Sequence, residues 1–296
     1  MDDLLDSALH LLGSTLRVST PLLFAALGGL ISERAGVVNI ALEGLMLVGA
    51  FAGATVAFMT HSPWLGASAA VGAGVFLAAI YALFVIEMRA DQIIAGMAIN
   101  MFAIGVTPFL SKILFNTSTS TPSLALALRF QVAPILFVWV CVFLIWVLLR
   151  FTPAGLWIQF AGEHPEALDS AGIRVKRVRW VAVLVSGCLA GLGGATLSIL
   201  LSSSFSRNMT AGRGFMALAA LIFGKWRPIP TALACLLFGF SDAVQILLQG
   251  VVLWGTEPVP VQFIQILPYI VTVLVLAGFV GHSRAPRALG QPFIKG

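Results

Sequence analysis

Polar side chains recur within the long apolar runs of this sequence, where each is costly unless it finds a hydrogen-bonding partner or faces an aqueous path. Asn39 and Glu43 lie four residues apart, which predicts that both occupy one face of a helix. Gln92 and Asn100 lie two helical turns apart and are predicted to face the same way. Such groups can hydrogen-bond a polar solute or join neighbouring helices, and the sequence leaves both roles open.

A third polar set, Ser241, Asp242 and Gln245, places a carboxyl group inside a late apolar run. Arg213 stands at the outer end of a short apolar run near residue 211. Its side chain can extend to the lipid headgroups, or it can pair with Asp242 or Glu43, and the sequence does not decide between these arrangements.

Two glycines, Gly36 and Gly44, flank the segment that carries Asn39 and Glu43. This pattern is typical of a helix that is interrupted to line a cavity. We therefore expect a structural or gating role for both glycines and for Arg213.

The elements that position these groups are membrane helices. The chain has 296 residues, of which 59% are hydrophobic and 10% charged, and its mean hydropathy is +1.01. Soluble domains carry about 25% charged residues, so the composition predicts an all-α polytopic membrane protein. We predict nine transmembrane helices, some of them broken, near 10–31, 38–58, 65–87, 92–112, 132–150, 178–202, 211–224, 229–249 and 262–281. The segment 211–224 is too short for a full crossing, so eight to ten spans are compatible with the pattern.

The distribution of basic residues predicts the orientation of the chain. The charged stretch Leu156–Arg179 ends with four cations just before an apolar run, a pattern that marks the cytoplasmic side. On this assignment only five of the 17 Lys and Arg residues fall outside: Arg17, Lys112, Arg129, Arg207 and Arg213. The N-terminus is then outside and the C-terminus is cytoplasmic.

Several functions are excluded by what the sequence lacks. The net charge is only +5 and the cations lie in short loops, so nucleic acid is not an expected partner. The three cysteines lie in separate apolar runs, which predicts neither a disulfide framework nor a metal site. No HExxH, GxSxG or CxxC motif occurs, and the nearest Gly-Lys pair, Gly224-Lys225, does not complete a phosphate-binding loop. We expect no enzymatic activity and no cofactor.

The middle of the charged stretch is typical of a docking helix. His164-Pro165-Glu166 is a helix start, because proline is favoured at the first helical position and an early acid complements the helix dipole. Gly172 is a natural stop two turns later.

Four segments of the chain together resemble a known family. They are SERAGVVNIALEGLMLVGAF (32–51), ADQIIAGMAIN (90–100), AGEHPEALDSAGI (161–173) and GRGFMALAALIFGKWRP (212–228). They are similar to the permease subunits of bacterial ABC importers for nucleosides and simple sugars, in the branched-chain amino acid/ribose permease superfamily. The first segment is closer to the nucleoside branch than to the ribose or amino-acid branches.

The resemblance implies one transmembrane permease domain, residues 1–296, in the cytoplasmic (inner) membrane of a bacterium. It also implies a second permease subunit, most simply in a heterodimer, separate cytoplasmic ATPases that bind the ATP, and a periplasmic or lipoprotein substrate-binding protein. Loop 153–179 would be the coupling segment that docks on the ATPase, through Glu163, His164, Pro165, Glu166, Ala167 and Gly172.

The expected substrate pathway consists of the polar groups inside the spans. Asn39, Asn100 and Gln245 suit a weak and transient nucleoside site, with Gln92 beside them. Glu43 and Asp242 either accept hydrogen bonds from ribose hydroxyls or hold helices together. The alternatives are a permease for a simple sugar, riboflavin or a branched-chain amino acid, a proton-coupled transporter that uses Glu43 or Asp242, and a membrane scaffold that transports nothing.

Overall fold

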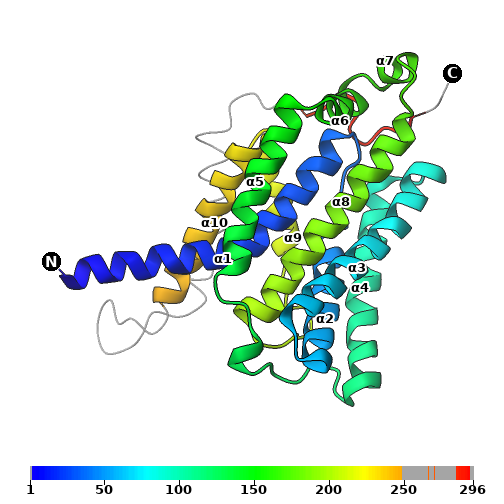
Figure 1. Cartoon of the computed structure of the whole chain (residues 1–296). Coiled ribbons are helices and arrows are strands. Elements are labelled where there is room, and N and C mark those ends of the chain that lie inside the picture. Colours follow the sequence, from blue (N-terminus) through cyan, green and yellow to red (C-terminus); the bar gives the residue numbers. More distant parts are fainter. Residues whose placement is uncertain (1, 249–265, 267–269, 271–284, 294–296) are drawn as a thin grey trace.

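The computed structural model describes residues 2–248, 266, 270 and 285–293. Apart from one isolated bridge between Ser120 and Ser206, the regular structure in this part of the chain is helical. The helices follow in the order α1 Asp2–Arg34, α2 Leu42–Thr60, α3 Pro63–Ala82, η1 Leu83–Glu87, α4 Gln92–Phe115, η2 Leu126–Leu128, α5 Ala133–Phe151, α6 Pro153–Glu163, α7 Pro165–Ser170, α8 Val175–Ala195, η3 Thr196–Leu201, α9 Arg213–Phe223 and α10 Pro228–Leu248. Figure 1 labels α1 to α10.

Seven helical segments within the described residues are long and apolar enough to cross a membrane, which confirms the predicted all-helical membrane class. α9 is shorter, as the sequence predicts: its 11 residues span about 16 Å, roughly half of a 30 Å hydrocarbon core. The ninth predicted span, 262–281, lies almost entirely outside the described residues.

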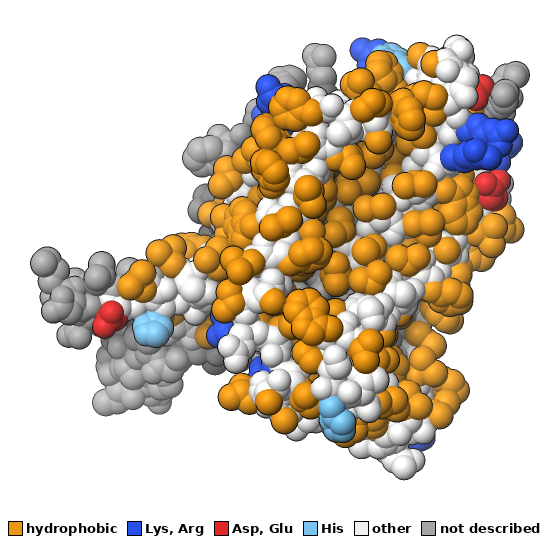
Figure 2. Space-filling view, in the orientation of Figure 1, with side chains coloured by type: hydrophobic (Ala, Val, Ile, Leu, Met, Phe, Trp, Pro, Cys, Tyr) orange, Lys and Arg blue, Asp and Glu red, His pale blue; other side chains and the backbone are white. Residues whose placement is uncertain are grey.

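The outer surface of the helices is apolar. Large side chains such as Met101 on α4 and Phe143 on α5 are 74% and 59% exposed, and lipid is the solvent that suits them. Figure 2 shows hydrophobic side chains over most of one face, with Lys and Arg side chains in clusters at the end that carries α6, α7 and the start of α8.

α8 lies at the centre of the bundle and packs on α1, α2 and α3 through small residues. A Cβ atom placed on Gly74 of α3 would come within 2.3 Å of the Gly187 carbonyl oxygen. A Cβ on Gly49 of α2 would come within 2.6 Å of the Gly191 backbone. The GxxxG pairs at 49/53 and 187/191 therefore allow close helix packing.

Two glycines on α3 provide a matched test of this packing. We expect Gly74→Ala to lower the free energy of unfolding by about 1–3 kcal/mol, because the methyl group would overlap the backbone of α8. Gly72→Ala is the control, since nothing lies within 4 Å of its Cβ position. Thermal unfolding of both variants in detergent would measure the difference, and equal melting temperatures would contradict the assigned packing.

Candidate functional site

The connection between α1 and α2 is an interrupted, buried stretch of backbone. α1 ends at Arg34, Gly36 turns the chain with a φ of +90°, and α2 begins only at Leu42. Asn39 therefore precedes the helix, so the prediction that Asn39 and Glu43 share one helix face is wrong. The physical reason is that residues 37–41 stay outside the helix, where the backbone groups of Val38 and Ile40 bond to side chains of α3 and α4.

Side chains of α3 and α4 form hydrogen bonds with the backbone groups that this break leaves without helical partners. The Gln92 Oε1 atom accepts a hydrogen bond from the Val38 N–H at 2.8 Å. Asn100 spans the start of α2: its Oδ1 accepts from the Gly44 N–H at 2.8 Å, and its Nδ2 donates to the Ile40 carbonyl at 2.9 Å. The Tyr81 hydroxyl of α3 donates to the Val38 carbonyl. Gln92 and Asn100 thus face the same way, as the sequence predicts.

Asn39 holds the break to α8. Its Nδ2 donates to the Ser186 hydroxyl at 2.8 Å, and its side chain is fully buried. The Asn39 Oδ1 atom has no hydrogen-bonding partner within the described residues, so one acceptor there is unused.

Glu43, in the first turn of α2, caps the N-terminus of α9. Its two carboxylate oxygens accept from the backbone N–H groups of Gly212 at 2.8 Å and Gly214 at 2.7 Å. A Cβ on Gly214 would come within 2.5 Å of the Glu43 backbone, so only glycine permits this approach. The carboxylate lies at the first turns of two helices, where their dipoles favour a negative charge. Glu43 therefore joins two helix starts inside the bundle.

Three of the predicted polar residues, Arg213, Asp242 and Gln245, are less engaged in hydrogen bonds than those of the break. Arg213 and Asp242 are half-buried and interact electrostatically, but they form no ion pair. Arg213 donates to the Met209 carbonyl at 3.3 Å, and Glu43 is already occupied by backbone N–H groups. Asp242 and Gln245 make no side-chain hydrogen bonds within residues 2–248, and Gln245 is also half-buried.

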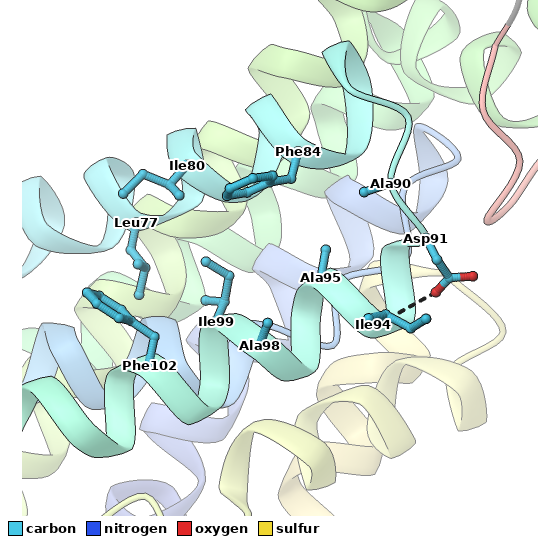
Figure 3. A pocket seen from close by; sticks show the side chains of 10 residues that line it. All are labelled: Leu77, Ile80, Phe84, Ala90, Asp91, Ile94, Ala95, Ala98, Ile99 and Phe102. Carbon is cyan, nitrogen blue, oxygen red and sulfur yellow. Dashed lines mark hydrogen bonds between the residues drawn. The ribbon is translucent and has the colours of Figure 1, made fainter.

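A pocket of about 450 Å³ between α3 and α4 is unsuited to a polar solute (Figure 3). Nine of its ten lining residues are apolar, and the carboxylate of the tenth, Asp91, points away from them. The Asp91 Oδ1 atom accepts from the Ile93 and Ile94 N–H groups, both at 2.9 Å. This pocket is open to apolar groups such as acyl chains and is not a candidate substrate site.

The predicted docking segment forms two short helices, α6 and α7, at one end of the bundle (Figure 1). Pro165 occupies the first turn of α7, and Gly172 follows its end with a φ of +82°. His164, Glu166, Ala167 and Gly172 are exposed, whereas Leu168 is buried against Ala161 and Val175. The apolar side of α7 is thus anchored, and its exposed side carries Glu166 and Ala167.

Backbone contacts connect α6 to the α1–α2 break. A Cβ on Gly162 would come within 2.2 Å of the Arg34 carbonyl. Residues 285–293 cross both elements: the Ala288 N–H donates to the Gly162 carbonyl at 2.8 Å, and the Gly290 N–H to the Gly36 carbonyl at 3.2 Å. At Glu163, the Oε2 atom accepts from the Arg287 N–H at 3.4 Å. The docking segment and the break are therefore in direct contact.

Several residues of this arrangement escaped sequence analysis. Arg179 was counted only as a loop cation, yet it is 3% exposed and donates to the Ala161 and Gln291 carbonyls. Tyr81 and Ser186 lie in apolar runs far from the break in sequence. The sequence offered one signal: Tyr81 is one of only two tyrosines in the chain, and its hydroxyl group within an apolar run needs a hydrogen-bonding partner.

Comparisons with known proteins identify relatives along most of the chain. Residues 11–276 match the family described as branched-chain amino acid transport system / permease component. The guanosine ABC transporter permease protein NupQ of Bacillus subtilis is 38% identical, over 96% of this chain and 96% of NupQ. TsgC13 of Haloferax volcanii, an ABC transporter permease protein for which glucose is the suggested cargo, is 33% identical over 95% and 94%.

A solved structure has the same fold. An ABC transporter in an inward-facing conformation superimposes with a TM-score of 0.52, covering 92% of this chain and 87% of that chain. The sequence identity is 16%, so this similarity concerns the fold alone.

The hydrogen bonds of Asn100 provide a test of the break. Asn100→Ala would leave the Gly44 N–H and the Ile40 carbonyl without their partner, and we expect a loss of about 1–3 kcal/mol in the free energy of unfolding. Met101→Ala is the control, because the Met101 side chain, next to Asn100 in sequence, is 74% exposed. If thermal unfolding in detergent showed no difference between the two variants, Asn100 would not support the break.

Proposed function

This chain belongs to the family of branched-chain amino acid transport system permease components and is a membrane subunit of an ABC importer; on that premise, we propose that it forms the import pathway for a nucleoside together with a second permease chain. Family membership also confirms that the chain is a multi-pass cell-membrane protein and is not itself an enzyme. ATP is bound by a partner ATPase, and a substrate-binding protein is implied.

The nucleoside assignment is supported first by the relatives. NupQ is named for guanosine and matches almost the full length of the chain at 38% identity. TsgC13 is less similar, at 33%, and its suggested cargo is a sugar. Nucleosides and simple sugars both present sugar hydroxyl groups. The base is therefore the group that distinguishes a nucleoside from a sugar.

The available polar groups have suitable chemistry for this cargo. A carboxylate such as Asp242 accepts hydrogen bonds from vicinal hydroxyls, and the Gln245 amide can both donate to and accept from a base edge. Both lie on α10, three residues apart, and Arg213 acts on Asp242 from the start of α9. We propose that Asp242 and Gln245 contact the substrate, and that Arg213 sets the charge of this region.

The remaining predicted pathway residues would act through the backbone. Asn39, Gln92 and Asn100 hold the α1–α2 break, and Glu43 holds the start of α9. A half-spanning helix that begins inside the membrane presents its N-terminus to the pathway, as discontinuous helices do in other transporters. We propose that Gly36 and Gly44 permit this geometry and that substrate passes beside it.

The proposed mechanism is alternating access driven from α7. With loop 153–179 cytoplasmic and the N-terminus outside, Glu163, His164, Pro165, Glu166, Ala167 and Gly172 would lie at the ATPase interface. Movement of α7 would pass through α6 to the Gly36 turn, because Gly162 contacts Arg34 and residues 285–293 bind both elements. Helices that are packed together in this way can shift as one rigid body between two states of a transporter.

Purified transporter in liposomes would test the cargo. We expect a nucleoside, delivered by the binding protein, to stimulate ATP hydrolysis, and a second permease chain and an ATPase to copurify. Gln245→Ala and Asp242→Asn should each raise the half-saturating nucleoside concentration about fivefold, the effect of one lost hydrogen bond.

The matched control for these variants is Leu247→Ala, an exposed side chain on the same helix. Stimulation by glucose but not by any nucleoside would contradict the nucleoside assignment. Proton-driven uptake by the chain alone would contradict the ABC mechanism.

The docking helix makes a separate prediction. Glu166→Arg changes an exposed side chain of α7, so folding should be unaffected, whereas nucleoside-stimulated ATP hydrolysis should fall because the ATPase contact is altered. His61→Arg, at the exposed end of α2, serves as the control. Equal ATPase stimulation in both variants would show that α7 is not the coupling element.

A further inference from the structure

Three arginines line a pocket of about 580 Å³ where α1, α5, α6 and α10 meet. The pocket lies at the end of the bundle that carries α6 and α7, and Figure 2 shows basic side chains over the end of α5 there. Its lining consists of Arg34, Trp146, Leu149, Arg150, Gln159, Arg227, Pro228, Ile229 and Pro230.

The positive charge of this pocket is not neutralised within the part of the chain that the structure describes. No acidic residue is among its lining, and none of its arginines forms an ion pair there. Arg34 and Arg227 are close enough to repel each other, and Glu163 acts on Arg34 only from beyond ion-pair distance. Like charges held together in this way favour the binding of an anion.

Two of the guanidinium groups are held in place. The Arg34 Nε atom donates to the Trp226 carbonyl at 2.7 Å, which leaves its terminal nitrogens to other partners. The Arg150 guanidinium lies 5.9 Å from the ring centre of Trp146 and 5.7 Å from that of Phe151. Preorganised guanidinium groups match the paired oxygens of a phosphate.

The surface beside the pocket is apolar. On α5, Phe143 and Leu144 are 59% and 55% exposed, and on α10 Leu233 is 61% exposed. Along α5, Trp146 lies between Leu144 and Arg150, and tryptophan is enriched where membrane helices meet the lipid headgroups. A ligand that fits both features carries an anionic head and hydrocarbon chains.

We propose that this pocket binds the phosphate headgroup of an anionic phospholipid, with its acyl chains along α5 and α10. Basic pockets between the ends of membrane helices bind such headgroups. Free phosphate would satisfy the arginines but would leave the adjoining apolar surface without a role. An acidic segment of a partner subunit fits less well, because its polar backbone would have to pack beside side chains that face lipid.

The site would connect the lipid environment to the docking segment. Gln159 of α6 lines the pocket and donates to the Leu149 carbonyl of α5 at 2.6 Å, so a bound headgroup would contact the corner between α5 and α6. This proposal requires only that the chain lies in a membrane and does not depend on the identity of the cargo.

Fluorescence quenching in liposomes would test the proposal on the full transporter. Trp146 emission, taken as the difference between the unchanged protein and Trp146→Phe, is measured with brominated phosphatidylglycerol or with phosphatidylcholine carrying the same brominated chains. We expect stronger quenching by phosphatidylglycerol. Arg150→Gln and Arg227→Gln should each weaken the preference for the anionic lipid about fivefold, and Arg89→Gln, an exposed cation outside the pocket, should not change it.

Retention of phosphatidylglycerol in native mass spectra of the purified complex gives a second readout that does not depend on tryptophan. Loss of retained lipid in both pocket variants, but not in Arg89→Gln, would support the site. Equal quenching by the two lipids would overturn the proposal. So would displacement of the lipid by inorganic phosphate at matched ionic strength, or a crosslink from residue 150 to a partner subunit in place of lipid.

Discussion

Backbone that leaves a helix in the interior of a membrane protein must find hydrogen-bonding partners within the protein, because neither water nor lipid supplies them there. In this chain the constraint applies to residues 35–41, between α1 and α2. Gln92, Asn100 and Tyr81 satisfy the polar groups there, and Asn39 fixes the segment to α8. The position of α2, and with it Glu43, follows from these bonds.

Glu43 extends the same constraint to α9. Its carboxylate holds two backbone N–H groups at the start of this half-spanning helix, so α2 and α9 share one fixed point. At the other end, Gly162 and residues 285–293 hold α6 against the Gly36 turn. The break is thus joined to α6 and α7 on one side and, through the start of α9, to the neighbourhood of Asp242 on the other.

Much of this arrangement was predictable from the sequence. Composition indicated the membrane class, Pro165 and Gly172 indicated α7, and the short run near 211 indicated a helix too short for a full crossing. Partners far apart in sequence were not predictable: nothing local connects Glu43 to Gly212 or Arg179 to Gln291. The error at Asn39 has the same origin: helical spacing to Glu43 was assumed, whereas side chains distant in sequence bind the backbone of Val38 and Ile40 outside the helix.

The central claim is that the docking helix and α2 move as one body through the α1–α2 break. Spin labels at Ala167 on α7 and at Thr60, the exposed end of α2, would measure this in the assembled transporter. The predicted result is an unchanged distance between the two labels in nucleotide-free and ATP-bound states, while the distance from Thr60 to the second permease changes. A change in the Ala167–Thr60 distance on ATP binding would contradict the account.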